Sequence, residues 1–385
     1  MTPGARIQAA IECLDAIAAG AAAEQVLTGW ARRSRFAGSK DRSAVRDHVF
    51  GVLRRWRSCA ALGGGETGRA LMLGALRQDD EPPEPLFSGL GHAPAPLTGD
   101  ELAAGRAPSE GPEALDMPDW LWPRLGEEAA QTAAALRHRA GVHLRVNLAK
   151  ADVPSAIESL ESSGIRAVPH PASPTALEVV EGARALRNAP AYTDGLVELQ
   201  DAASQAVVDK LQLRAGMRVL DLCAGGGGKT LAIAARCPEA EVFAHDIAPQ
   251  RLNDLLPRAD RAGAKVLVLG TDRLEAEAPF DLVVCDVPCS GSGSWRRAPE
   301  GKWRLDAAAL DRLRTTQADI LRQAMGLTSA DGTVAYATCS VLDEENSALI
   351  QTVLGETSGW ALVSEARWPV TQGTDGFYTG HLRRV

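Results

Sequence analysis

The chain lacks an apolar run of about 18 residues, the length that a membrane-spanning helix requires. Its first residues, Met1 to Gln8, contain no apolar signal core. A disulfide framework is missing too, because the seven cysteines are odd in number and scattered, and no Cys-x-x-Cys pair occurs. The seven histidines are dispersed, so no metal site is expected. These absences exclude a membrane protein and a secreted disulfide scaffold, and they predict a cytoplasmic protein.

An excess of positive charge is also missing, since the formal net charge is −8. The distribution of charge is more informative than its sum. Basic residues gather in the first sixty positions: Arg32, Arg33, Arg35, Lys40, Arg42, Arg46, Arg54, Arg55 and Arg57. Acidic residues gather in the next stretch: Asp79, Asp80, Glu81, Glu84, Asp100, Glu101, Glu110 and Glu113. A basic module beside an acidic linker is compatible with RNA binding, and an ordinary solvated surface is the alternative.

The length of 385 residues predicts two or three domains. Residues 1–78 have the apolar spacing of amphipathic helices, as in Ile7, Ile11 and Leu14. Residues 79–115 are rich in Pro, Gly and acids, which predicts a linker of loops and short turns. Residues 116–200 combine a helix opening at Met117–Trp122, strand patterns at 144–147 and 177–180 and a helix pattern at 157–160, which indicates a small α+β subdomain.

Strands and helices alternate over residues 201–385, which predicts an α/β fold with a parallel sheet covered on both faces. The expected strands are 218–222, 241–245, 265–269, 281–285 and 332–337. The expected helices are 229–236, 249–262, 306–327 and 343–354. The tail from Trp360 to Leu382 suits an antiparallel hairpin that closes the sheet.

A glycine-rich loop follows the first of these strands. It comprises Cys223, Ala224, Gly225, Gly226, Gly227, Gly228 and Lys229. Glycines let a ligand approach the backbone, and the helix N-terminus after them favours a carboxylate or a phosphate. A P-loop requires glycine where Cys223 stands, and a dinucleotide loop requires glycine where Thr230 stands, so neither template fits. Asp246 ends the second strand about 20 residues later, where an acid grips a ribose diol.

Arg251 flanks the same expected pocket, and Asp272 follows the third strand. For each of the two acids, capping of a helix is the alternative interpretation, and for Arg251 it is an ordinary surface position. Asp286 and Cys289 follow the fourth strand, and Cys339 follows the fifth. Ligands of open α/β sheets bind at the carboxyl ends of strands, so two cysteines at such ends beside a cofactor loop indicate function.

The isolated cysteines are interpreted as small buried hydrophobes: Cys13, Cys59, Cys237, Cys285 and the side chain of Cys223. Two indoles and several cationic side chains follow Cys289, between Trp295 and Arg304. Such a set is suited to stacking on a base and pairing with phosphates.

The stretch Asp286-Val287-Pro288-Cys289-Ser290-Gly291-Ser292-Gly293 resembles motif IV of the RsmB/NOP (Sun) family of RNA cytosine-5 methyltransferases, with Val287 where Ala is usual. Thr338-Cys339-Ser340 resembles motif VI of that family, and the glycine loop resembles motif I, with Gly225-Gly226 in place of Ala-Pro. Residues 38–55 resemble the NusB-like helical domain of RsmB-type enzymes. Residues 117–147 resemble the RRM-like subdomain that precedes the family's catalytic core.

The resemblance implies a Rossmann-like class I core at 201–385 that uses S-adenosyl-L-methionine. The loop 223–229, Asp246, Arg251, Asp272 and Asp286 would hold that cofactor. Cys339 would be the nucleophile that adds to cytosine, Cys289 would assist elimination, and Asp286 would bind the base edge, with Lys229 aiding the local field. The implied partner is RNA, with 16S ribosomal RNA expected either free or in an early particle; a monomer without membrane association is expected.

Several alternatives stay open on the residues alone. Transfer RNA is another possible substrate of the same chemistry. A DNA cytosine-5 methyltransferase uses the Pro-Cys cysteine as nucleophile, and the second cysteine at position 339 argues against it. A catalytically silent NusB-like RNA-binding protein conflicts with the presence of both cysteines and all the acids. A nucleotide-hydrolysing enzyme fails at Cys223.

Overall fold

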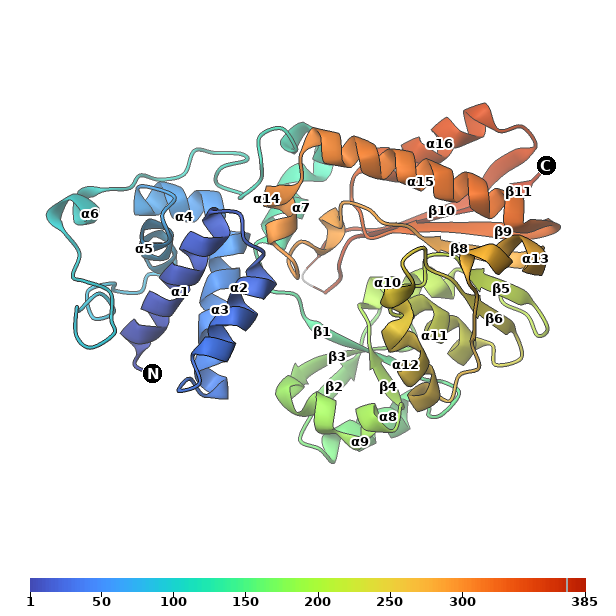
Figure 1. The fold of residues 1–385 in the computed structure, drawn as a ribbon, viewed down its shortest axis with the longest axis horizontal. Coiled ribbons are helices and arrows are strands. Elements are labelled where there is room, and N and C mark those ends of the chain that lie inside the picture. Colours follow the sequence, from blue (N-terminus) through green and yellow to red (C-terminus); the bar gives the residue numbers. More distant parts are fainter. Residues whose placement is uncertain (372) are drawn as a thin grey trace. The chain divides into compact units, whose positions relative to one another are not determined.

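The computed structural model describes residues 1–371 and 373–385 (Figure 1). The chain forms two compact units. The first comprises Met1–Arg139 together with Trp295–Arg304, and the second comprises Ala140–Ser294 together with Leu305–Val385. The domain boundaries expected from the sequence remain a prediction, because this division into two units does not test them. Within the described ranges, no helix combines the length and the apolar content needed to cross a membrane.

Five helices form the core of the first unit: α1 (Pro3–Ala18), α2 (Ala23–Arg33), α3 (Ser39–Arg54), α4 (Trp56–Gly63) and α5 (Gly68–Gln78). Threonine side chains cap two of them, because the Thr2 hydroxyl accepts from the Ala5 amide and the Thr67 hydroxyl from the Ala70 amide. The apolar faces predicted around Ile7 and Val45 meet in one buried cluster. The helical front region expected from the sequence is therefore present.

The predicted linker contains one short helix, α6 (Gly99–Ala103), and otherwise lacks regular structure. It packs on the helices, since Phe87 lies in their core. The 3-10 helix η1 (Trp122–Glu128) and α7 (Ala129–Leu136) follow.

The segment Trp295–Arg304, which contains α14 (Glu300–Arg304), returns to this first unit from the middle of the catalytic sequence. Trp295, Arg296 and Lys302 are each at most 2% exposed. The expectation that both indoles of this segment stack on a base therefore fails for Trp295, which the helical unit buries, and survives only for the half-buried Trp303.

The second unit begins with a small antiparallel sheet of order β2-β3-β1-β4. Its elements are β1 (Val142–Val146), α8 (Val153–Glu161), β2 (Arg166–Pro169), β3 (Ala176–Glu181), η2 (Ala183–Asn188), α9 (Pro190–Thr193) and β4 (Val197–Leu199). The strand patterns at 144–147 and 177–180 were predicted, whereas β2 and β4 were not. β2 is mostly exposed and β4 is very short, so neither carries a strong apolar alternation.

The main sheet has the order β10-β11-β9-β8-β5-β6-β7. Its strands are β5 (Arg218–Asp221), β6 (Glu241–Ala244), β7 (Leu267–Val268), β8 (Phe280–Asp286), β9 (Thr328–Thr338), β10 (Trp360–Trp368) and β11 (Phe377–Arg384). The strands from β5 to β9 pair in parallel, and β10 and β11 form the antiparallel hairpin expected of the tail. The Rossmann-like fold predicted from the sequence is confirmed.

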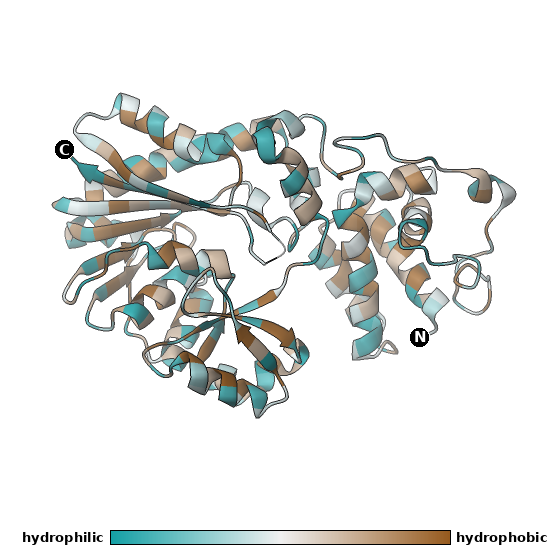
Figure 2. Ribbon diagram, turned by 180° about the vertical axis from the view of Figure 1, so that it is seen from behind, coloured by the Kyte–Doolittle hydropathy of each residue, from teal (hydrophilic) through white to brown (hydrophobic). Residues whose placement is uncertain are grey.

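Helices cover both faces of this sheet (Figure 1). They are α10 (Ala202–Asp209), α11 (Gly228–Arg236), η3 (Pro249–Asp254), α12 (Leu255–Ala262), η4 (Thr271–Arg273), α13 (Leu274–Glu277), η5 (Ser292–Ser294), α15 (Ala307–Leu327), η6 (Asp343–Glu345) and α16 (Ser347–Glu356). Alternate residues of one strand enter opposite cores: Val283 packs with Leu321 of α15, whereas Leu282 packs with Ile233 of α11. Figure 2 shows apolar and polar residues alternating around these helices. Such amphipathic helices are what a doubly covered sheet requires.

The strand order reverses between β5 and β8, since β6 and β7 continue in one direction from β5 and β9 lies beyond β8. Ligands of open α/β sheets bind at the carboxyl edge of such a switch point. The glycine loop follows β5 and the Pro-Cys loop follows β8, so the topology brings both loops to this edge.

Candidate active site

Cys289 and Cys339 meet at the carboxyl edge of the main sheet. Cys289 lies in the loop after β8, Cys339 directly follows β9, and their sulfur atoms are 3.5 Å apart. The parallel pairing of β8 and β9 accounts for this distance, because it places Asp286 opposite Ala337. Both side chains are partly accessible, unlike Cys285, which is fully buried. The two cysteines predicted to act therefore lie side by side at this edge of the sheet.

The thiol pair is electrostatically asymmetric. The hydrogen bond between the two thiols lowers the pKa of Cys339. Burial of the sulfur and the Asp286 carboxylate oppose this shift, whereas Lys229 and the Ser294 hydroxyl reinforce it. The same hydrogen bond, together with burial, raises the pKa of Cys289 well above its usual value. The pair therefore favours thiolate character on Cys339 over Cys289, which is the direction that a nucleophile needs.

Glu345 accepts hydrogen bonds from both cysteine loops, the one after β8 and the one after β9. Its fully buried carboxylate accepts the Ser290 backbone amide at 2.8 Å and the Ser290 hydroxyl, both in the Pro-Cys loop. It also accepts the Ser340 hydroxyl from the loop of Cys339 and the Gln317 side-chain amide of α15 at 2.9 Å. Gln317 in turn donates to the Pro288 carbonyl at 2.9 Å. One carboxylate thus sets the position of the residues next to both sulfur atoms.

Gly293 and Ser292 close the same loop. The Gly293 amide donates to the Cys339 carbonyl at 2.9 Å, and the Gly293 carbonyl accepts from Gly376 at 2.9 Å. A Cβ atom at position 293 would lie 2.1 Å from the Gly376 carbonyl oxygen, so only glycine fits there. The buried Ser292 hydroxyl accepts from the Val341 amide at 2.9 Å. Gly293 of the motif therefore serves close backbone packing.

Lys229 and Asp286 form an ion pair beside the cysteines. Their Nζ and Oδ2 atoms are 2.7 Å apart, and the lysine side chain is only 5% exposed, whereas that of Asp286 is 36% exposed. Lys229 also contacts the Ser204 hydroxyl at 3.4 Å and lies 5.1 Å from the centre of the Phe377 ring. Because Lys229 is enclosed and Asp286 is open, the carboxylate is the member of the pair that a substrate can reach.

The glycine loop folds around Asp246. One oxygen of this buried carboxylate accepts the Gly225 amide at 3.0 Å, and the other accepts the Ala248 amide at 3.0 Å. Arg251 pairs with Asp246 at 3.2 Å. Gly225 has a φ of +51°, a left-handed conformation that glycine adopts without strain. Replacing the family's usual Ala-Pro with glycines thus matches a backbone that needs this freedom.

His245 and Asp221, which the sequence analysis did not single out, support this edge. The His245 ring contacts the Leu222 carbonyl at 2.9 Å and the Thr271 hydroxyl at 3.1 Å, which links the ends of β5 and β6 to η4. Asp272, also on η4, is exposed. Asp221 ends β5, accepts the Thr230 hydroxyl at 2.6 Å, and burial raises its pKa to about 6.

The small sheet also holds the glycine loop. Arg145 of β1 donates to the Gly228 carbonyl at 2.8 Å and to the Gln200 side chain at 2.5 Å. Arg258 of α12 donates to the Gly226 carbonyl. The subdomain before the catalytic core therefore contributes directly to the shape of the loop.

The predicted residues separate into two neighbouring groups. Cys289, Cys339, Asp286 and Lys229 form one group, and the loop 223–229 with Asp246 and Arg251 forms the other. Cys223 is largely buried, and burial raises its pKa, which suits a contribution from its backbone alone. Glu345, Gln317 and His245 were missed, since no local motif marks a buried polar side chain whose partners are distant in sequence.

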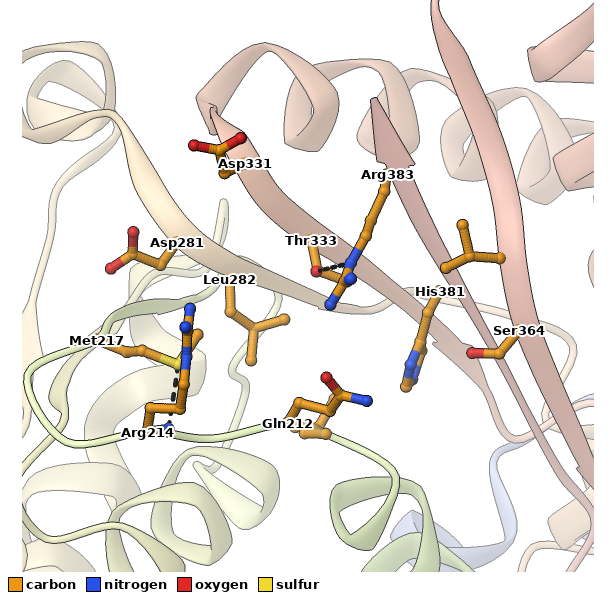
Figure 3. Close-up of a pocket in the computed structure, with 12 residues that line it drawn as sticks. Gln212, Arg214, Met217, Asp281, Leu282, Asp331, Thr333, Ser364, His381 and Arg383 are labelled. Atoms are coloured by element: carbon orange, nitrogen blue, oxygen red, sulfur yellow. Dashed lines mark hydrogen bonds between the residues drawn. The ribbon is translucent and has the colours of Figure 1, made fainter. Parts of the chain in front are cut away.

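A cavity of about 570 Å³ opens at the opposite edge of the sheet (Figure 3). Asp281 near the start of β8, Thr333 of β9 and Arg383 of β11 line it, and Arg383 donates to the Thr333 hydroxyl at 2.9 Å. None of the predicted site residues borders it. The candidate active site therefore rests on the cysteine edge and not on this hollow.

Two family models match the chain. The model of the 16S rRNA methyltransferase RsmB/F family matches residues 208–383, and that of the RsmF/B-like ferredoxin-like domain matches residues 117–185. Among curated proteins, the ribosomal RNA small subunit methyltransferase B of Salmonella arizonae is 36% identical over 284 residues, covering 69% of this chain and 66% of the relative. The protein of that name from Shigella flexneri is 34% identical over 282 residues, with the same coverage. The chain thus spans 66% of the length of these relatives.

Solved structures share the fold. The structure of PH0851 superposes with a TM-score of 0.78 at 23% identity, covering 100% of this chain and 99% of that one. NSun6 from Pyrococcus horikoshii, solved with SFG, gives a TM-score of 0.61 at 17% identity, covering 70% of this chain and 98% of that one. At these identities the likeness establishes the architecture alone.

Proposed function

The chain belongs to the RsmB/F family of methyltransferases, and from this premise we propose that it transfers a methyl group from S-adenosylmethionine to carbon 5 of a cytosine in RNA. The relatives are named for the ribosomal small subunit, so a cytosine of 16S ribosomal RNA is the proposed substrate. The observation that carries the proposal is the pair of sulfur atoms 3.5 Å apart beside the glycine loop. A methyltransferase acting on an oxygen or an exocyclic nitrogen needs no such pair.

Cytosine carbon 5 is a poor nucleophile. Addition of the Cys339 thiolate to carbon 6 forms a carbon–sulfur bond and moves the electron pair of the 5,6 double bond to carbon 5. Asp286 binds the polar edge of the ring, which requires a proton on the carboxyl or on N3. After methylation, loss of the carbon-5 proton returns an electron pair to the ring and expels the thiolate. Cys289 assists this elimination: its thiol gives its proton to the departing Cys339 sulfur, and the thiolate left on Cys289 accepts the carbon-5 proton. The base must leave its stack to reach these groups.

The glycine loop 223–229 and the acids that follow β6 and β7 fit S-adenosylmethionine. Backbone amides of a glycine loop at a helix start suit its carboxylate, and Asp246 and Asp272, after β6 and β7, suit its ribose and adenine. The cofactor supplies an electrophilic methyl group. A structural neighbour, NSun6 from Pyrococcus horikoshii, was solved with SFG, an analogue of this cofactor, which supports the assignment. Lys229 forms a short ion pair with Asp286 beside the glycine loop.

Replacing Asp246 with alanine is expected to weaken S-adenosylmethionine binding by roughly 1–3 kcal/mol, the usual loss when a charged hydrogen-bond partner is removed. Alanine also frees the Gly225 amide, whose bond to Asp246 shapes the loop. Calorimetry on the purified full-length chain measures the change. Asp254→Ala, which removes an exposed carboxylate of η3, is the matched control and should bind normally. Wild-type affinity in Asp246→Ala would remove Asp246 from the site.

The function itself is tested by RNA bisulfite sequencing of cells that lack the protein. We expect one cytosine of 16S ribosomal RNA to lose its protection from deamination, and a plasmid copy of the gene to restore it. The purified chain with S-adenosylmethionine should then methylate the same position in unmodified RNA. Loss of protection in a transfer RNA would keep the chemistry and change the substrate. Unaltered protection throughout, together with no methyl transfer in vitro, would refute the proposal.

A further inference from the structure

A recess lies within the first unit, and none of the residues assigned to catalysis borders it. Its volume is about 640 Å³, within the range of small-ligand sites. Three indoles border it: Trp56 of α4, Trp120 before η1, and Trp303 of α14. All three are half-buried, although large aromatic side chains contribute most to folding when they are fully enclosed. We call this recess the indole cavity.

Trp303 is held in a fixed orientation. Its Nε1 atom donates to the Leu53 carbonyl at 2.7 Å, and the Lys302 ammonium lies 4.7 Å from the centre of its ring. Lys302 is itself buried and donates to the Arg54 carbonyl at 2.9 Å. One edge and one face of the indole are therefore occupied, and the opposite face remains for a flat ligand. A ring fixed in advance loses little conformational entropy on binding.

The charges around the indole cavity disfavour a phosphate. Three acids border it, Glu66, Asp119 and Glu300, against two arginines, Arg57 and Arg304. Arg57 is already paired with Asp119, through two contacts of 2.6 and 3.1 Å. The residues that border the cavity offer a phosphate no excess of positive charge, whereas a neutral ring with amino donors and carbonyl acceptors finds partners of both kinds.

A cationic ligand is disfavoured as well. Aromatic cages attract cations through free ring faces. Here Lys302 lies over Trp303, and the Arg124 guanidinium lies 5.5 Å from the centre of the Trp120 ring. A further cation would compete with these groups and be repelled by them. The ligand that remains is an uncharged aromatic ring.

We propose that the indole cavity holds an unpaired base of the RNA substrate by stacking, an inference that rests on the proposed function for its source of bases. Only an unpaired, splayed base offers a free face to an aromatic side chain. The segment that carries Trp303 is the direct continuation of the loop after Cys289, because the chain leaves the catalytic unit at Ser294 and enters the helical unit at Trp295.

The test uses the full-length chain and a fluorescent single-stranded RNA of mixed sequence, with the same RNA as a perfect duplex for comparison. Trp303→Ala and Trp120→Ala should each weaken single-strand binding by roughly 5-fold to 150-fold, the measured range for loss of one base–aromatic stack. Trp303→Phe should retain most of the affinity. Phe36→Ala is the matched control, since Phe36 is 76% exposed in the same unit but does not border the indole cavity. It should bind as the wild type does.

Three further readouts separate stacking from other causes. The dependence of binding on salt should be the same in the wild type and the indole variants, because no phosphate contact is lost. Duplex binding should not change, and S-adenosylmethionine affinity should not change, which shows that the second unit is intact. Trp120→Ala protects the test against misfolding of Trp303→Ala, since the Trp120 indole makes no hydrogen bond in the described part of the chain that its loss would break.

Single-strand affinities equal to the wild type in both indole variants would assign the cavity to another occupant, such as a protein segment, and would overturn the proposal. An equal loss for single strand and duplex would overturn it too, as would a wild-type chain that binds no single-stranded RNA. Failure of the proposed function looks different: the indole variants would still lose single-strand affinity, but the wild type would bind no S-adenosylmethionine and transfer no methyl group.

Discussion

Replacing Cys339 with alanine is expected to abolish methyl transfer and to leave no covalent complex with RNA. The hydrogen bond with Cys289 and the charge of Lys229 both lower the pKa of Cys339, so thiolate character is favoured on this sulfur. Loss of a nucleophile removes several orders of magnitude of rate. Denaturing electrophoresis of the protein with labelled RNA and S-adenosylmethionine checks for the complex, and transfer of a labelled methyl group checks turnover.

Cys289→Ala is expected to lose turnover and yet accumulate a protein–RNA complex that survives denaturation. Cys339 is retained, so the adduct forms, whereas the group that assists elimination is missing. Alanine also removes the hydrogen bond that lowers the pKa of Cys339. The rate of adduct formation should therefore rise with pH through a higher midpoint than in the wild type, because more alkaline solution is needed to form the thiolate.

Cys289→Ser is the matched comparison, since its hydroxyl keeps a donor next to Cys339. Its pH midpoint should lie closer to that of the wild type than the midpoint of Cys289→Ala does. A trapped complex in Cys339→Ala and none in Cys289→Ala would reverse the two roles and favour the mechanism of DNA cytosine-5 methyltransferases.

Glu345→Ala is expected to lower methyl transfer by about 100-fold or more while leaving S-adenosylmethionine affinity unchanged. The carboxylate anchors Ser290 beside Cys289 and Ser340 beside Cys339, and alanine would leave both loops without their common acceptor. A displacement of about 1 Å at a reacting group can cost on the order of 100-fold in rate. Each buried donor left unpaired costs about 1–3 kcal/mol, so the free energy of unfolding should fall as well.

Glu345→Gln keeps the side-chain volume and one acceptor oxygen and should restore part of the activity. Asp343→Ala removes an exposed carboxylate two residues away, paired at the surface with Arg367, and should change little. Rate measurements, calorimetry with the cofactor and urea unfolding on the same preparations separate the contributions. Full activity in Glu345→Ala would show that the two loops hold their geometry without it.

Local chemistry explains why much of this protein was predictable from its residues. The period of the apolar residues marked the helices and the buried strands, and Gly-rich and Pro-Cys stretches marked the loops at their ends. Parallel pairing then implied a shared carboxyl edge, so the loop 223–229, Asp246, Asp286 and both cysteines were named in advance. These features depend on the preferences of neighbouring residues, which a sequence displays directly.

Other features depend on partners that are distant in sequence. The 3.5 Å between the sulfurs of Cys289 and Cys339 follows from the register of β8 and β9, and Glu345 reaches Ser290 across 55 residues. Trp295 and Trp303 looked equivalent in the sequence, but the helical unit buries the first and leaves the second half-accessible. Burial and long-range hydrogen bonds are set by packing between elements, and no local pattern carries that information.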